Sequence, residues 1–227
     1  MTRGTEERRG GSSAAPIRLP GGSALLAVDV QNGFISIPDE LPIPDARSVI
    51  PIVNRLLPRF AIRVASQDWH PKGHGSFASS HPGRRPFEMG ELSGMPQRLW
   101  PDHCVQGSPG SAFHPDFDHH AIQAIFRKGT DPLVDSYSVF TDNAGKNPTG
   151  LDGYLRARGA SALCLAGLAL DYCVLYTSRD ARRLMPGLPV FVVEDACRAV
   201  NPTTGREAIE EMHSLGIRLV NSGALGI

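Results

Sequence analysis

The sequence predicts a three-layer α/β/α fold built on a doubly wound, Rossmann-like sheet of about six mainly parallel strands. Short apolar runs alternate with segments whose apolar residues recur at helical spacing, which is typical of a parallel sheet covered on both faces. Right-handed crossovers bring the carboxyl ends of such strands to one edge, so polar residues at those ends are expected to meet there. Those residues are Asp29, Asp68, His70, Lys128, Asp171, Cys173 and Asp195.

The first expected strand is a continuous apolar run and the one that begins at Ala162 is a short one, which suits burial on both faces. Asp171 is expected to cap the N-terminus of the helix that follows the fourth strand. Thr203 or Thr204 is expected to cap the N-terminus of the last helix. Gly159 and Gly216 are expected just after helix ends. The strands are expected over 24–30, 62–66, 121–127, 162–166, 189–193 and 217–220, and the helices over 45–60, 151–158, 171–184 and 203–215, with a long loop over 71–119.

The length and composition predict one α/β domain over residues 23–227, preceded by a disordered N-terminal extension over residues 1–22. That extension is rich in Gly, Ser, Arg and Glu and lacks the apolar core of a secretory signal. The net charge of zero gives no reason to expect nucleic acid or an anionic membrane as a partner. The four cysteines form no CxxC pair, which favours reduced thiols and a cytoplasmic protein. There is no glycine-rich phosphate loop, so the sequence does not support nucleotide binding.

Cys173 stands where the fourth strand gives way to a helix, at the edge where ligands bind in open α/β sheets. A thiol in the first helical turn lies near the positive end of the helix dipole, which lowers its pKa and favours the thiolate. This predicts a nucleophilic cysteine. The alternative is a half-buried cysteine packed under a turn, and this stretch alone does not separate the two.

Asp29 and Lys128 end two other strands and would meet Cys173 at the same edge. An aspartate is an unusual base for a thiol, because their reference pKa values are about 3.9 and about 8.5. Burial or coupling must bring the two closer, and a lysine would balance the negative charge. Taken singly, Asp29 is explained as well by a turn cap, Lys128 by a solvated strand end and Cys173 by an inert thiol. Their shared edge favours a catalytic group.

Asp68 and His70 are two residues apart, so in extended backbone both side chains point the same way. With His103 they would offer one carboxylate and two imidazoles, which suit zinc, iron or manganese. The spacing of Asp68 and His70 indicates a metal site, whereas the sequence position of His103 says little by itself. His74 and Ser76 are further donors in the same loop.

Aromatic residues lie in the loops above the same edge and would form a slot for a flat heteroaromatic substrate. Ordinary hydrophobic packing of loops explains them equally well. The residues are Phe34, Trp69, Trp100 and Tyr137.

Six segments together resemble the nicotinamidases, also called pyrazinamidases, of the isochorismatase-like cysteine hydrolase superfamily. The resemblance extends over about residues 24–220 and keeps the family's order and spacing. The Asp, Lys and Cys segments mark the superfamily, and the DWH and WPDHC segments are specific to nicotinamidases. The segments are DVQNGF at 29–34, QDWHP at 67–71, WPDHCV at 100–105, FRKG at 126–129, DSYSVF at 135–140 and GLALDYCV at 167–174.

The resemblance implies a role for each site residue and a sheet with strand order 3-2-1-4-5-6. It implies a cis peptide between Leu168 and Ala169. Two positions depart from the family: Gly33 stands where Asp is common, and Leu170 where Thr is usual. The implied roles are a catalytic triad of Asp29, Lys128 and Cys173, an oxyanion hole from the backbone N–H groups of Ala169 and Cys173, metal ligands Asp68, His70 and His103 with Ser76 as a weaker candidate, and substrate contacts from Phe34, Trp100 and Tyr137.

The implied activity is metal-dependent hydrolysis of nicotinamide, and of pyrazinamide, to the acid and ammonia through a Cys173 thioester, in NAD salvage. The implied cofactor is one divalent ion, zinc before iron or manganese, and the implied partner is the small-molecule substrate. A homo-oligomer is the default for such a chain. The nearest alternative is a sister hydrolase of an isochorismate ether, an N-carbamoyl amine or a ureido acid, which would share the triad without the Asp-x-His metal site. A non-catalytic metal-binding protein on the same scaffold is a third.

Overall fold

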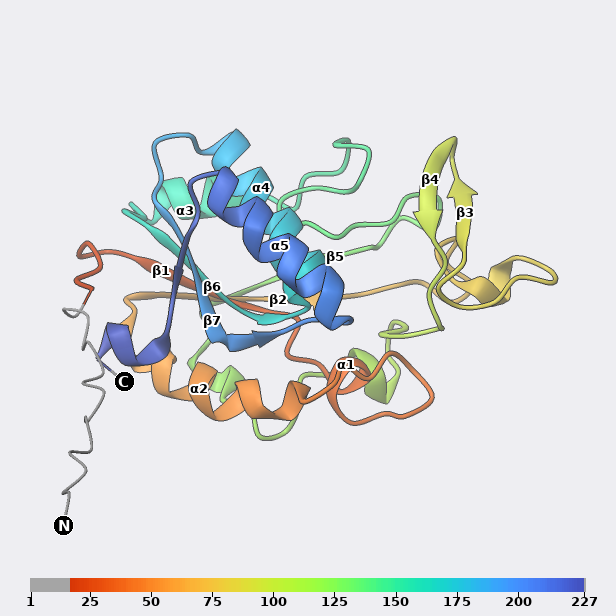
Figure 1. The fold of residues 1–227 in the computed structure, drawn as a ribbon, viewed down its shortest axis with the longest axis horizontal. Helices are drawn as coiled ribbons and strands as arrows, with labels where there is room; N and C mark the ends of the chain where they lie inside the picture. The colour runs from red at the N-terminus through yellow and green to blue at the C-terminus, as the bar shows by residue number, and fades with distance from the viewer. Residues whose placement is uncertain (1–16, 227) are drawn as a thin grey trace, which may run out of the picture.

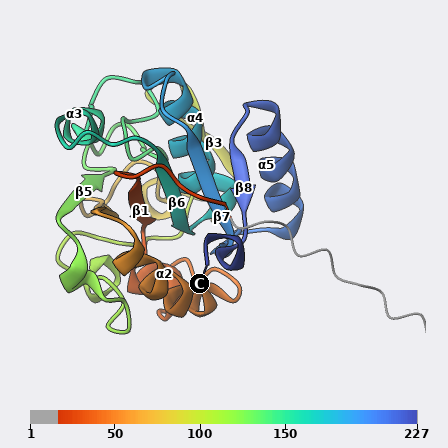
Figure 2. The ribbon, with the colours of Figure 1, turned by 90° about the vertical axis from the view of Figure 1, so that its left-hand side faces the viewer.

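The computed structural model of the chain describes residues 17–226 and confirms the predicted fold class. Six parallel strands form the central sheet in the order β5-β2-β1-β6-β7-β8, which is the order that the resemblance implied. The sheet crosses the middle of the molecule in Figure 1 and is seen from another side in Figure 2. The sheet strands are β1 (Ala24–Val28), β2 (Ile62–Asp68), β5 (Ala124–Lys128), β6 (Leu163–Leu168), β7 (Val190–Arg198) and β8 (Arg218–Val220).

Helices cover both faces of the sheet, as a doubly wound fold requires (Figure 1). One buried cluster lies between the sheet and α2, and a second lies between the opposite face and helices α3, α4 and α5. The helix expected over 45–60 is a short α-helix with a 3₁₀ turn at each end, Ala46–Ser48 and Leu57–Arg59. The α-helices are α1 (Asn32–Ile35), α2 (Val49–Leu56), α3 (Leu151–Ala157), α4 (Leu175–Leu184) and α5 (Pro202–Ser214).

Gly167 does not end the fourth strand of the sequence, contrary to the prediction. β6 continues through it to Leu168, with Gly167 at φ 128°. A Cβ at this position would overlap the backbone of Val28 on the neighbouring strand β1. The glycine therefore allows two central strands to approach closely just before the predicted site.

β7 is longer than predicted, because it continues through Glu194 and Asp195 to Arg198 after a register shift against β6. Asp195 therefore lies within a strand, and its carboxylate accepts the N–H of Ser222 at 2.8 Å. Placing Asp195 among the residues at the functional edge was wrong. In the sequence, the polar pair Glu194 and Asp195 inside the strand looks the same as a strand end.

The cap of the last helix also differs from the prediction. Asn201 caps α5, its Oδ1 accepting the N–H of Thr203 at 2.8 Å, with Pro202 in the first turn. This fits the preference of proline for the first helical position, which moves the start of the helix ahead of Thr203.

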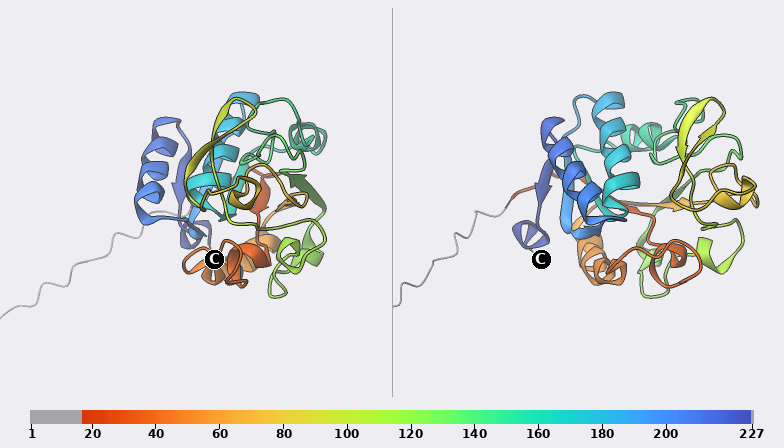
Figure 3. Two further views of the ribbon diagram at one scale, coloured as in Figure 1. Left: turned by 90° about the vertical axis from the view of Figure 1, so that its right-hand side faces the viewer. Right: turned by 45° about the vertical axis from the view of Figure 1, so that its right-hand side comes forward.

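The long loop expected over 71–119 contains an antiparallel hairpin, which the sequence did not indicate. Strands β3 (Met89–Leu92) and β4 (Met95–Arg98) are joined at Ser93 and Gly94, both with positive φ. The hairpin stands apart from the central sheet (Figure 1; Figure 3, right). Short strands that pair only with each other give little apolar alternation to detect.

Most of the extension expected over residues 1–22 lies outside the described residues. In its last part, the N–H of Ile17 donates to the carbonyl of Ala224 at 2.8 Å, and Leu19 packs against the core. Among residues 17–226, no helix combines the length and apolar character needed to cross a membrane.

Candidate active site

Lys128 brings together the ends of three strands. Its Nζ lies 3.0 Å from Oδ2 of Asp29 and 3.3 Å from Sγ of Cys173, and all three side chains are buried. Lys128 is the last residue of β5, and its backbone is paired with Asp68 at the end of β2. Strand β2 lies between β5 and β1. The long lysine side chain therefore reaches across the end of β2 to Asp29. The three residues of the predicted triad form one contact group.

Asp29 follows β1 directly and has a left-handed backbone, with φ 48°. Its N–H donates to Oγ of Ser66 on β2 at 3.2 Å, and that hydroxyl donates to Oδ1 of Asp29 at 2.6 Å. Ser66 thus fixes one carboxylate oxygen of Asp29, while the other faces Lys128.

Cys173 lies in a turn that connects β6 to α4. The Leu168–Ala169 peptide bond before the turn is cis, as the resemblance implied. One turn of π-helix, Leu170–Val174, follows and precedes α4. The same turn places Ala169 and Cys173 together on the wall of one cavity.

Asp171 does not cap the helix, contrary to the prediction. Its carboxylate accepts the N–H groups of Val200 and Asn201, at 2.9 and 3.2 Å, and also the hydroxyl of Thr204. These residues surround the start of α5. Asp171 therefore connects the turn that carries Cys173 to the start of α5. This contact joins residues far apart in the sequence, so local spacing does not predict it.

Burial has the largest effect on the titration of Cys173. Burial raises the pKa of its thiol well above the usual value; Lys128 opposes the rise, and the carboxylates of Asp29 and Asp68 add to it. This direction is the opposite of the predicted lowering, because burial disfavours the charged thiolate. Burial also raises the pKa of Asp29 against the opposing charge of Lys128. A raised pKa makes Asp29 a stronger base than an exposed aspartate.

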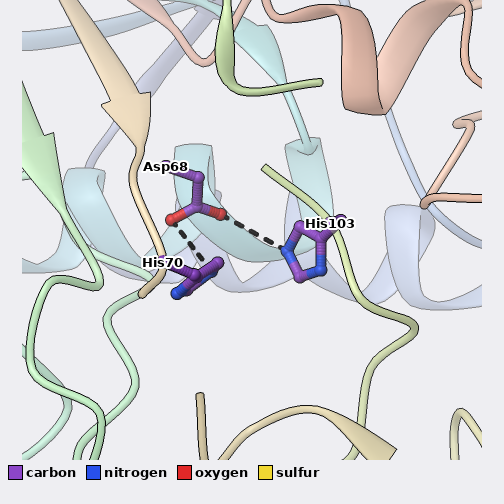
Figure 4. Close-up of side chains that lie close together, drawn as sticks. All are labelled: Asp68, His70 and His103. Carbon is purple, nitrogen blue, oxygen red and sulfur yellow. Dashed lines mark ion pairs between the residues drawn. The ribbon is translucent and has the colours of Figure 1, made fainter. Parts of the chain in front are cut away.

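Asp68, His70 and His103 form the predicted second cluster (Figure 4). Nε2 of His70 lies 3.5 Å from one carboxylate oxygen of Asp68, and Nε2 of His103 lies 3.6 Å from the other. All three side chains are buried. Two imidazole nitrogens and a carboxylate facing one another fit a borderline divalent ion such as zinc, iron or manganese.

The other ring nitrogen of each histidine is held by a backbone carbonyl. Nδ1 of His70 lies 3.0 Å from the oxygen of Gly129, and Nδ1 of His103 lies 2.8 Å from that of Pro101. A carbonyl only accepts, so Nδ1 of each ring donates its proton there, and Nε2 of each ring is the nitrogen that faces Asp68. Gly129 has φ 66°, and a Cβ there would lie 2.5 Å from Cε1 of His70. Only glycine allows this approach.

Lys128 also contacts the metal-site carboxylate, with Nζ 2.7 Å from Oδ1 of Asp68. Burial acts to raise the pKa of Asp68, but Lys128 and His70 outweigh it and hold that pKa well below the usual value. Burial acts to lower the pKa of Lys128, and the carboxylates of Asp29 and Asp68 hold it well above the usual value instead. Asp68 and Lys128 are therefore both ionised at neutral pH.

Ser76 is buried near this cluster, but its hydroxyl is engaged by a neighbour. Its Oγ lies 2.8 Å from Nδ1 of His74, whose Nε2 lies 2.7 Å from the carbonyl oxygen of Asp131. His74 is thereby paired at both nitrogens. The structure gives Ser76 a hydrogen-bonding role and leaves its metal contact a prediction.

The predicted aromatic residues Phe34, Trp100 and Tyr137 line one cavity together with Cys173 and the Asp68 cluster. The Tyr137 hydroxyl accepts the indole N–H of Trp100 at 3.3 Å. A cavity of this kind suits a small aromatic molecule. Trp69 does not line it; the guanidinium of Arg127 lies 3.7 Å from the centroid of its ring instead.

The sequence analysis did not identify five residues that line this cavity: Leu41, Ile43, Asp135, Tyr172 and Val200. Asp135 is buried, and its carboxylate accepts the side-chain amide of Gln97 at 2.8 Å. Two of these residues could have been predicted from their neighbours in the sequence. Asp135 lies two residues before Tyr137, and Tyr172 lies directly before Cys173. Val200 reaches the cavity only through the long-range contact with Asp171, which no local pattern predicts.

Comparison with protein families matches residues 23–223 to the model described as the isochorismatase domain. The chain is 46% identical over 202 residues to the nicotinamidase of Escherichia coli, covering 86% of this chain and 93% of that protein.

Solved structures of similar proteins have the same fold. A nicotinamidase and pyrazinamidase from Acinetobacter baumannii has a TM-score of 0.85 at 41% identity, covering 92% of this chain and 100% of the other. The pyrazinamidase of Pyrococcus horikoshii in complex with zinc has a TM-score of 0.69 at 34% identity, covering 88% and 99%.

Proposed function

Because the chain belongs to the isochorismatase-domain family, we propose that it hydrolyses nicotinamide to nicotinic acid and ammonia. The observation that carries this function is the contact of Lys128 with Asp29, Cys173 and Asp68 at one end of the cavity. A buried thiol, a raised-pKa carboxylate and a fixed cation are the groups that amide hydrolysis through a thioester requires. We expect pyrazinamide, which presents a similar ring carboxamide, to be a second substrate.

In the first half of the reaction, Asp29 removes the proton of the Cys173 thiol, and the sulfur attacks the carboxamide carbon. Burial raises the pKa of Asp29 and makes it a stronger base, and the charge of Lys128 acts to lower the pKa of the Cys173 thiol, which favours the thiolate. Lys128 stays charged and offsets the negative charge on carboxylate and sulfur. The N–H groups of Ala169 and Cys173 hold the oxyanion, an effect worth about 3 kcal/mol per donor. Asp29 then protonates the departing nitrogen, the C–N bond breaks, and ammonia leaves a thioester.

In the second half, Asp29 takes a proton from a water molecule, whose oxygen attacks the thioester carbon. The C–S bond breaks, nicotinic acid forms, and the sulfur recovers its proton through Asp29. No redox step occurs, so atoms and electrons balance with water as the only co-substrate.

Asp68, His70 and His103 are proposed to hold one divalent ion, with zinc first among the candidates because a zinc-bound pyrazinamidase is similar to this chain. When bound, the ion would supply a Lewis-acidic contact for a ring nitrogen and so orient the substrate. Phe34 and Trp100 are proposed to contact the pyridine ring, with Tyr137 fixing Trp100 through its hydroxyl. Contacts to the ring and its nitrogen would orient the carboxamide toward Cys173.

The proposed setting of the reaction is cytoplasmic NAD salvage, with nicotinamide as the partner and no nucleic acid or membrane. The buried, disulfide-free state of the four cysteines is compatible with a reducing compartment. A homo-oligomer is proposed as the default assembly.

The decisive experiment is ammonia release from nicotinamide by the purified chain, before and after chelation and with divalent ions added back. Turnover that falls on chelation and returns with zinc, iron or manganese is the expected result. No turnover in fully metallated protein would reject the proposal. Activity on N-carbamoyl or ureido substrates in that protein would identify a sister hydrolase.

A further inference from the structure

The carboxylate of Glu40 lies in a recess formed by two glycines next to the metal-ligand cluster. A Cβ on Gly110 would overlap the carboxylate of Glu40, and a Cβ on Gly33 would overlap it as well. Neither glycine has a positive φ, so the backbone conformation does not require glycine at these positions. The absence of both side chains makes room for the carboxylate. An aspartate at position 33, which the resemblance leads one to expect, would have no room beside it.

In this recess, Oε2 of Glu40 accepts the N–H of Cys104 at 2.8 Å. Cys104 follows the metal-ligand candidate His103 and has φ 47°, in the left-handed region that costs a non-glycine residue about 1 kcal/mol. The carbonyl of Cys104 accepts the N–H of His70 at 3.1 Å. One residue thus connects Glu40 to the backbone of both histidines.

We propose that Glu40 is a positioning residue for the metal site, holding Cys104 so that Nε2 of His103 stays opposite the carboxylate of Asp68. The proposal rests on the metal site of the proposed function. It follows from three observations. Gly33 and Gly110 determine where the Glu40 carboxylate lies. That carboxylate holds Cys104, the residue after His103, and Cys104 in turn accepts the N–H of His70. Glu40 itself is absent from the metal-ligand cluster and from the lining of the catalytic cavity.

The test is the zinc dissociation constant, measured by competition with a chromophoric chelator, for the wild-type chain and matched variants. Glu40→Ala removes the acceptor of the Cys104 N–H and should weaken zinc binding by about 10- to 100-fold, as loss of an outer contact to a metal ligand does elsewhere. Glu40→Gln keeps an acceptor oxygen without the charge and should retain most of the affinity. If Glu40→Gln weakens binding as much as Glu40→Ala, the hydrogen bond is not the cause and the proposal is overturned.

Gly110→Ala gives an independent test, because it displaces the carboxylate without removing it. It should weaken zinc binding in the wild-type chain but add little in the Glu40→Ala background, since no carboxylate remains to displace. Gly153→Ala, where a Cβ meets no atom within 4 Å, is the control and should leave zinc binding unchanged. Additive effects of Glu40→Ala and Gly110→Ala would overturn the proposal.

Two further outcomes separate this proposal from the proposed function. A wild-type chain that binds no zinc, iron or manganese would overturn the metal site and the role of Glu40 together. A wild-type chain that binds zinc while Glu40→Ala binds it equally tightly would overturn the role of Glu40 alone. Thermal unfolding of the metal-free variants shows whether each is folded, so a loss of affinity is read only in folded protein.

Discussion

The Nζ of Lys128 lies 2.7 Å from Oδ1 of Asp68, so one buried ammonium group joins the catalytic triad to the metal-ligand cluster. The sequence presented these as two separate groups of residues. In the structure they share a cation, and the carboxylates of Asp29 and Asp68 both depend on it. A change at Lys128 is therefore expected to affect nucleophile and metal site together.

Replacing Lys128 by methionine should abolish activity and destabilise the protein. Both carboxylates would be left buried without their cation, and breaking a buried ion pair in this way costs about 3–5 kcal/mol. Urea denaturation would measure the change in unfolding free energy. Lys146→Met, at an exposed position, is the matched control and should change little. Equal stability of the two variants would contradict the ion-pair account.

Replacing Cys173 by alanine should lower ammonia release by at least about 10³-fold while the protein keeps its metal. The variant lacks the sulfur that forms the thioester, and removal of a nucleophile has effects of this size or larger. Turnover assays and elemental analysis of the same sample would measure both properties. Wild-type turnover in this variant would exclude Cys173 as the nucleophile.

As the pH is lowered, kcat/KM should fall at a higher pH than it would if Asp29 had the pKa of an ordinary aspartate. Asp29 must be ionised to accept the thiol proton, and burial raises its pKa, so activity is lost as the pH falls through that raised value. The hydrogen bond from Ser66 lowers this pKa. Ser66→Ala should therefore move the acid limb to still higher pH. A limb that stays in place would show that Asp29 does not govern it.

The thiol of Cys173 should react slowly with iodoacetamide at neutral pH and faster as the pH rises beyond the range of a free cysteine. Its pKa is raised well above the usual value by burial, and the thiolate is the reactive form. Alkylation rates followed by mass spectrometry of the Cys173 peptide would give the profile. A midpoint below that of a free cysteine would restore the helix-dipole interpretation.

Replacing Gly129 by alanine should weaken metal binding, because a Cβ would collide with the ring of His70. Gly73→Ala is the matched control: Gly73 also has a positive φ, 72°, but a Cβ there meets no atom within 4 Å. Both variants should lose about 1 kcal/mol of stability from backbone strain. Only Gly129→Ala should also raise the zinc dissociation constant, measured by chelator competition.

The alternation of apolar runs and helical segments was enough to predict the layered fold, because burial on both sheet faces leaves a clear pattern in the sequence. The boundaries were less well predicted. Gly167 looked like a strand end but allows close approach to Val28, and Asp171 looked like a helix cap but binds the start of α5. Both errors have one cause: the partner is far away in the sequence.

The residue types at the strand ends can be read from the chain alone, and Asp29, Asp68, His70, Lys128 and Cys173 do lie together in the structure. How these residues interact depends on the folded arrangement of the chain. The reach of Lys128 across β2, the recess for Glu40 between Gly33 and Gly110, and the raised pKa of Cys173 all depend on groups that are distant in the chain. Charge and desolvation depend on distance in space, which local spacing does not encode.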